Sequence, residues 1–185
     1  NQGSWEDGSL CGWPECKMVH PMRGYGHLGA YFNDDGINLM HDTFFDPMAK
    51  ETKLLLDTAA KYAPDVIVNL HGAANAGYGI YAPGYAAKVD RDKVREFEQQ
   101  LKARFIKSKV KFEETLCFTD DHEFNLTTAL YLACGGLSFT WESYQGVIND
   151  DEENTLTEKV YDEILNAHYM FYEEFFKLAL EKYIG

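Results

Sequence analysis

An apolar run that follows a helix almost without a gap constrains the fold of this chain most. The segment Asp65-Val66-Ile67-Val68-Asn69-Leu70 is nearly continuous in apolar, mostly β-branched residues, and Pro64 stops the helical pattern that precedes it. A strand of this kind, reached from a helix through a two-residue turn, is typical of a strand that helices bury on both faces. The segment therefore predicts a helix-covered sheet.

The rest of the chain alternates helical and extended patterns around that strand. The first helix is expected from Asp46-Pro47, with Asp46 as N-cap, to Pro64. After a long loop over residues 71–87, a second helix is expected over about residues 90–107. A short helix capped by Asn125 ends at Gly135, between strands at 116–119 and 137–141. The last helix starts with the capping box Thr155-Leu-Thr-Glu158 and runs to about Tyr183.

Apolar side chains at helical spacing predict which helix faces enter the core. We expect the buried positions of the three longer helices to be Leu54, Leu55, Ala59 and Tyr62; then Val94, Phe97, Leu101 and Phe105; then Tyr161, Leu165, Tyr169, Tyr172, Phe176 and Leu180. The predicted fold class is α/β, as one domain over residues 1–185 with three α/β/α layers and a mixed, largely parallel sheet.

Length and charge exclude several classes of function. The 185 residues are 45% hydrophobic and 25% charged, a balance typical of one globular domain. Seventeen Lys and Arg against thirty Asp and Glu give a net charge of −13, which repels phosphate backbones and anionic lipids. No apolar run reaches 18 residues. We therefore expect neither a nucleic-acid partner nor membrane insertion.

The four cysteines leave the redox state open. Cys11 and Cys16 flank a turn-forming Gly-Trp-Pro-Glu spacer that can bring the two sulfurs together, so a bridge and free thiols are equally open, and Cys117 and Cys134 complete an even count of four. No second close Cys or His pair completes the four ligands of a zinc knuckle.

Two titratable residues stand where predicted strands give way to loops. His71 follows Val-Ile-Val-Asn-Leu, and Glu142 follows Leu-Ser-Phe-Thr-Trp. Ligands of such sheets bind outside the carboxyl ends of the strands. A neutral imidazole there is a common metal ligand, and a carboxylate beside aromatic residues suits a general base. Asp120-Asp121-His122-Glu123 is an alternative metal cluster, although adjacent residues of an extended chain point to opposite sides.

Several strings, read in order, resemble the zinc metallocarboxypeptidases of the carboxypeptidase A superfamily. They are Asp34 to Asp42, Glu51-Thr52, Pro64 to Gly72 with its Asn-Leu-His-Gly end, and Cys134 to Glu142 with its Gly-Gly-x-x-Phe-Thr-x-Glu pattern. The resemblance spans roughly residues 17 to 146.

The resemblance implies a zinc-dependent peptidase and a role for each matched residue. His71 matches the last zinc ligand, which closes a site begun by an upstream His-x-x-Glu, and Glu142 matches the general base that acts on zinc-bound water. Arg23, 18 residues before His41, matches a guanidinium that stabilises the oxyanion. His41 and Phe124 fall at substrate-binding positions. The usual location of the family's members and the Cys11/Cys16 spacing indicate that the protein is secreted to an extracellular or periplasmic location.

The chain departs from the family in ways that keep alternatives open. It contains no His-x-x-Glu, so we expect the other two zinc ligands to precede Asn1 in a longer gene product, of whose catalytic domain this chain is the larger, C-terminal part. A histidine at position 41 cannot make the bidentate contact of a carboxylate-gripping arginine. A zinc deacylase acting on a modified amino acid or a cell-wall peptide therefore remains an alternative, as does a non-catalytic, metal-free binding domain.

Overall fold

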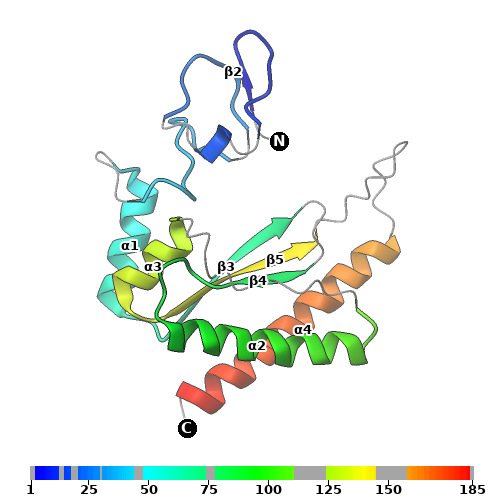
Figure 1. Cartoon of the computed structure of the whole chain (residues 1–185). Coiled ribbons are helices and arrows are strands. Elements are labelled where there is room, and N and C mark those ends of the chain that lie inside the picture. The colour runs from blue at the N-terminus through cyan, green and yellow to red at the C-terminus, as the bar shows by residue number, and fades with distance from the viewer. Residues whose placement is uncertain are drawn as a thin grey trace. The chain divides into compact units, whose positions relative to one another are not determined.

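The chain forms two compact units in a computed structural model that describes residues 3–12, 15–17, 21–29, 31–43, 48–73, 78–110, 124–144 and 158–183. The first unit comprises Asn1–Pro64 and Glu123–Gly135, and the second comprises Asp65–His122 and Gly136–Gly185. Figure 1 shows their helices and strands, most of them labelled, coloured along the chain. Each unit has its own packed elements, so we describe them in turn.

The second unit is built on a three-stranded sheet. Its strands are β3 (Val66–Ala73), β5 (Leu137–Tyr144) and β4 (Gly79–Tyr81), in the order β3-β5-β4. The long β3–β5 pairing is parallel, and the short β4–β5 pairing is antiparallel. The predicted α/β class with a mixed sheet is therefore confirmed. Strand β4 lies inside the segment that we predicted to be a loop.

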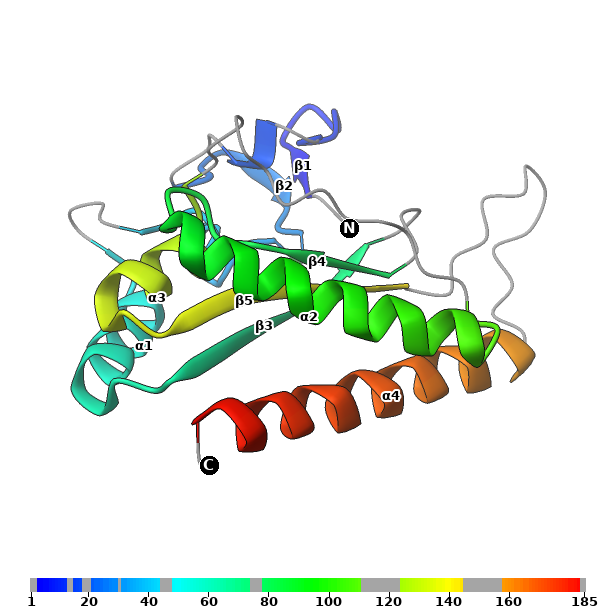
Figure 2. The ribbon, with the colours of Figure 1, turned by 60° about the horizontal axis from the view of Figure 1, so that its bottom comes forward.

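Two helices cover the apolar face of this sheet. They are α2 (Lys88–Lys107) and α4 (Glu158–Tyr183), which run beside each other along the sheet (Figure 2). Alternation along β5 directs Leu137, Phe139 and Trp141 into the core that these helices share. The Trp141 and Phe171 rings stack with centroids 4.4 Å apart. All four predicted core residues of α2 are buried, which confirms that helix and its face.

Arg104 joins the two helices at the edge of this core. Its guanidinium on α2 forms ion pairs with Glu173 and Glu174 on α4. The three charged groups lie beside the aromatic core and fix one helix against the other at this point. Because such partly exposed pairs are screened by water, the buried rings stabilise the packing more than the charges do.

The predicted core stripe of α4 is wrong. Its members are exposed, between 40% and 66% for Tyr161, Leu165, Tyr169, Phe176 and Leu180, and Tyr172 is half-buried. Among the α4 residues whose burial the structure describes, the buried side chains are Ala167 and Phe171. The helix carries apolar residues on two adjacent faces, and the pattern alone does not say which one packs. The face that stacks on Trp141 and contacts α2 is the one that enters the core.

The prediction for β3 also needs correction. Val66 and Val68 are only half-buried, and Leu70 is exposed, so β3 is not buried on both faces. The reason is its position, because β3 lies at the end of the strand order with β5 as its neighbour. The central strand β5, which lies between two others, is buried from Leu137 to Trp141.

The first unit contains α1 (Lys50–Tyr62) and α3 (Leu126–Cys134), which contact each other. As predicted, Asn125 caps α3: its Oδ1 accepts a hydrogen bond from Thr128 N at 3.1 Å. Gly135 ends α3 with φ +72°, the left-handed conformation that glycine adopts without strain. The helix α1 begins at Lys50 with Ala49 at the N-cap position, and the described residues Met48 and Ala49 are not helical, so the predicted helix start at Asp46-Pro47 is wrong. Asp46 and Pro47 themselves lie outside the described residues.

The predicted core face of α1 is only partly right. Ala59 is buried, but Leu54, Leu55 and Tyr62 are exposed. The buried positions are Thr52, Leu56 and Ala59, so the packed face is rotated from the predicted one and is less apolar. The short helix α3 contacts α1, while Leu54, Leu55 and Tyr62 of α1 stay exposed.

The beginning of the first unit is a small antiparallel pair with its own apolar cluster. Strand β1 (Ser4–Trp5) pairs with β2 (Tyr25–His27), and a 3-10 helix η1 spans Glu15–Lys17. Cys11 and Cys16 are free and fully buried in a cluster with Met22 and Phe32. The disulfide that their spacing permits is not formed.

Several sequence predictions fall outside the described residues. They concern the strand at 116–119, the cluster at 120–123 and the capping box at 155–158, of which only the helical residue Glu158 is described. Within the described part of the chain, no helix is long and apolar enough to cross a bilayer.

Candidate functional site

His71 and Glu142 form a direct contact in the second unit. The imidazole Nδ1 lies 3.0 Å from Oε1 and 3.2 Å from Oε2 of the carboxylate. The Glu142 side chain is 17% exposed and the His71 side chain 37% exposed, so the pair is partly shielded yet reachable from solvent. A histidine and a carboxylate at this separation can share and move a proton.

The parallel pairing of β3 and β5 creates this contact. Eight consecutive residue pairs, from Val66 opposite Leu137 to Ala73 opposite Tyr144, place His71 opposite Glu142. Residues paired in register project to the same face of a sheet, and both belong to the alternation that faces away from the α2 and α4 core. Because the two strands run in the same direction, both residues lie near the carboxyl ends, where ligands of such sheets bind.

Two further residues support the pair. Ser143 Oγ donates a hydrogen bond to the His71 carbonyl oxygen at 3.2 Å, which ties the strands together beside the contact. Gly79 of β4 lies opposite Glu142 on the other side of β5. Since it has no side chain, it places nothing beside the carboxylate on that strand.

Glu142 raises the pKa of His71 above its ordinary value of 6.5, because the carboxylate hydrogen-bonds to the ring and stabilises the imidazolium. Partial burial of the ring opposes this effect and is outweighed by it. The contact fixes Nδ1 as the nitrogen that faces Glu142. The opposite nitrogen, Nε2, is the atom that can accept a proton or bind a metal ion.

The described residues supply too few donors for catalytic zinc. Such a site uses three protein ligands and a water molecule, whereas this pair offers one imidazole and one carboxylate. In the described part of the chain, no three His, Cys, Asp or Glu side chains gather in a group that could hold a metal. His71 suits a single ligand through Nε2, with Glu142 as the carboxylate that orients its ring. These residues alone do not form the zinc site that the resemblance implies.

The other predicted site residues belong to the first unit. Arg23 is exposed just before β2, His41 is half-buried and its backbone N donates to Asn38 O at 3.0 Å, and Phe124 is half-buried next to the Asn125 cap. The structure therefore brings together one predicted pair, His71 with Glu142. The oxyanion role of Arg23 and the substrate-binding roles of His41 and Phe124 stay predictions.

Sequence reasoning missed Gly79 and Ser143. A signal for β4 exists, since Gly79-Ile80-Tyr81 is a short run with apolar character that ends just before Ala82-Pro83. Nothing in the sequence indicates that β4 pairs with β5, because that depends on how the chain returns to the sheet. Ser143 directly follows the predicted base, but its hydrogen bond depends on the β3–β5 register.

Comparison of the chain with protein-family models, with curated proteins and with solved structures finds no match in any of the three. The function of the site is therefore argued from its own geometry.

Proposed function

We propose that this chain belongs to a carboxypeptidase-like hydrolase that cleaves a peptide or related amide bond, with His71 and Glu142 as its acid–base pair. The observation that carries the proposal is the 3.0 Å contact between His71 Nδ1 and the Glu142 carboxylate at the carboxyl ends of two parallel strands.

The pair has the properties that amide hydrolysis requires. A base must take a proton from water as its oxygen attacks the carbonyl carbon, and the same proton must reach the nitrogen that leaves when the C–N bond breaks. Neutral His71 can accept the proton at Nε2, because Glu142 stabilises the imidazolium that results. The imidazolium can then protonate the amine. The carboxylate orients the ring and stabilises its charged form.

The proposal has a second part, which is zinc binding by His71. It can be tested separately from the acid–base role of the His71–Glu142 pair. The resemblance makes His71 a zinc ligand and Glu142 the base, with two further ligands from outside the described residues. His71 Nε2 cannot hold a metal ion and a proton at the same time. In the metal-free hydrolase this nitrogen is therefore the base, and in the zinc hydrolase it is a metal ligand. Zinc bound there would supply a Lewis acid for the scissile carbonyl.

The experiment is a hydrolase assay of the full-length gene product with Glu142→Gln and His71→Gln. Peptides with free and with blocked carboxyl ends distinguish a carboxypeptidase from a deacylase. Glu163→Gln, which removes an exposed α4 carboxylate far in sequence from the pair, is the matched control. We expect both site variants to lose about a hundredfold or more in kcat, while the control retains full activity.

Metal analysis and activity measured after chelation separate the two versions. Loss of activity that zinc restores supports zinc-dependent hydrolysis, and unchanged activity supports the metal-free pair. Full activity in Glu142→Gln would contradict the proposed role of the pair. A wild-type protein inactive on every substrate, even with zinc added, would support the non-catalytic binding domain instead.

A further inference from the structure

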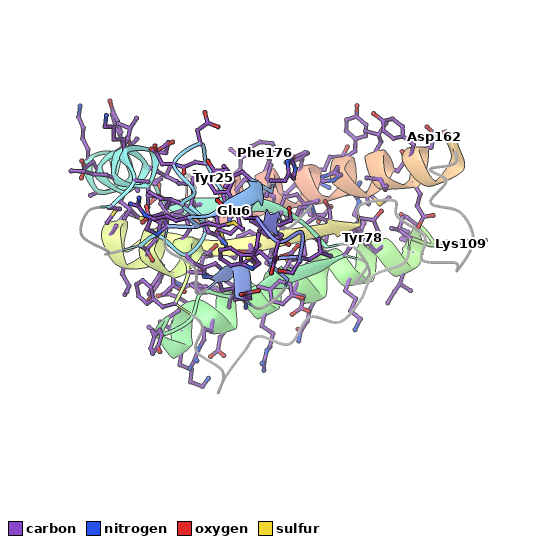
Figure 3. All side chains as sticks on the ribbon, turned by 90° about the horizontal axis from the view of Figure 1, so that it is seen from above. Glu6, Tyr25, Tyr78, Lys109, Asp162 and Phe176 are labelled. Carbon is purple, nitrogen blue, oxygen red and sulfur yellow. The ribbon has the colours of Figure 1, made fainter. Side chains whose placement is uncertain are left out.

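Helix α4 presents a second apolar face that lies largely outside the core of the second unit, although its half-buried member Tyr172 packs against that core. We call its members, Tyr161, Leu165, Tyr169, Tyr172, Phe176 and Leu180, the α4 stripe. Five of the six are at least 40% exposed, and the stripe runs along nearly the whole helix. Figure 3 shows Asp162 and Phe176 near opposite ends of α4, on the side of the helix that faces away from α2. A contiguous exposed apolar surface of this kind marks an interaction site.

The α4 stripe has the same spacing when it is read from either end. Its members are separated by 4, 4, 3, 4 and 4 residues, so its midpoint falls between Met170 and Phe171. A second copy of α4, antiparallel and centred on that midpoint, therefore places Tyr161 opposite Leu180, Leu165 opposite Phe176, and Tyr169 opposite Tyr172. Each position meets a different member of the same stripe, as a two-fold symmetric interface requires.

This arrangement allows one contact between opposite charges beside the α4 stripe, although Glu173 and Glu181 lie on the same flank and Lys177 also pairs with Glu174 within the helix. Asp162 follows Tyr161 and Lys177 follows Phe176, so both lie on the same flank of the helix. A two-fold axis across an antiparallel pair brings that flank against its own copy. Asp162 of one copy then lies within about two residues, or roughly 3 Å along the axis, of Lys177 in the other. In a parallel pair the same flanks of the two copies lie on opposite sides of the interface, so this contact does not form.

The exposed area is sufficient for a specific but weak contact. At roughly 200 Å² for a complete aromatic side chain, the exposed members present on the order of 500 Å² per copy. A symmetric pair would bury about 1,000 Å², which is near the lower limit for a specific interface. A stable obligate dimer buries more, so the area indicates association that depends on protein concentration.

We propose that α4 is a homodimerisation surface, through which two copies of this chain pair antiparallel with Leu165 of each against Phe176 of the other. The proposal does not depend on hydrolase activity, since neither His71 nor Glu142 belongs to the α4 stripe.

The test is sedimentation velocity of the full chain from about 1 µM to about 100 µM, a range that spans weak affinities. A salt concentration of about 0.15 M limits general repulsion between copies that carry a net charge of −13. We expect a dimer whose Kd is micromolar. Leu165→Glu should weaken it at least about tenfold, because each copy would bury an unpaired charge. Ile106→Glu is the control, since Ile106 is 65% exposed on α2 and lies outside the α4 stripe.

A charge reversal tests the antiparallel register separately. Asp162→Lys alone should weaken the dimer, and Asp162→Lys combined with Lys177→Glu should restore it. A monomer at every concentration would overturn the proposal, and so would equal losses in Leu165→Glu and Ile106→Glu. Failure of the double reversal to restore the dimer would overturn the antiparallel register. A monomer that binds neutral phospholipid vesicles through the α4 stripe would assign this surface to lipid instead.

Discussion

The imidazole of His71 faces the carboxylate of Glu142 across two parallel strands, with Nδ1 3.0 Å from Oε1. The two residues are 71 positions apart in sequence, and eight in-register pairs between β3 and β5 bring them together. Proton transfer at this site is therefore a property of the pair, and a change in one residue should be measurable at the other.

Removal of the Glu142 charge should lower the pKa of His71. In the wild type, the carboxylate raises that pKa above 6.5, while partial burial acts in the opposite direction. In Glu142→Gln, burial remains without the negative charge, so we expect a pKa below the wild-type value. Titration of the His71 ring protons by NMR measures the change. His168 is the internal control, because its pKa is lowered by burial alone and should not move. An unchanged His71 pKa would show that the contact does not persist in solution.

The same pair should stabilise the fold most at mildly acidic pH. Since the folded pKa of His71 is raised, the pair's contribution is complete below the unfolded value near 6.5 and disappears as the pH rises through the folded value. Urea unfolding of the wild type and of Glu142→Gln should therefore differ more in free energy at about pH 6 than at about pH 9. A difference that is constant or that grows with pH would contradict this sign.

The part of the fold set by local pattern could be predicted from sequence. The Asn125 cap, the Gly135 end of α3 and the buried face of α2 follow from residue chemistry at short range, and the structure confirms all three. His71 and Glu142 could be selected because each directly follows a predicted strand. Their contact follows once those strands are parallel neighbours.

The part that depends on long-range packing could not be predicted. Helix α4 has two apolar faces, and only the positions of Trp141 and α2 decide that Phe171, not Phe176, enters the core. The apolar composition of β3 predicts a buried strand, but its position at the edge of the sheet leaves Leu70 exposed. The periodicity of a helix or strand identifies which residues share a face. It does not show which face packs against another element.

Two phenylalanines on α4 provide a matched pair for this distinction. Phe171 is fully buried against Trp141, whereas Phe176 is 58% exposed. We expect Phe171→Ala to lower the free energy of unfolding by about 3–5 kcal/mol, because it leaves a cavity in the core. Phe176→Ala should cost less than about 1 kcal/mol in dilute protein. Urea denaturation of both variants measures the difference. Equal losses would mean that α4 packs through both faces within one copy.

The cap of α3 should contribute measurable stability to the first unit. Asn125 Oδ1 accepts a hydrogen bond from Thr128 N in the first turn of α3, where the backbone N–H groups have no carbonyl oxygen of a preceding helical turn to bond to. We expect Asn125→Ala to cost about 1 kcal/mol, and Asn125→Asp, which retains a side-chain acceptor, to cost much less. Thermal unfolding followed by circular dichroism compares the two. A similar loss in both variants would show that the cap does not stabilise α3.

Cys11 and Cys16 should be unreactive in the folded protein although both are free thiols. Both are fully buried beside Met22 and Phe32, and burial raises the pKa of each thiol, with the nearby Glu15 acting in the same direction. Since the thiolate is the reactive form, alkylation should be slow in buffer and fast in urea. Peptide mapping after labelling with and without urea measures both sites. Rapid labelling in buffer would contradict the buried cluster, whereas a linked peptide containing both cysteines would show that the bridge forms in solution.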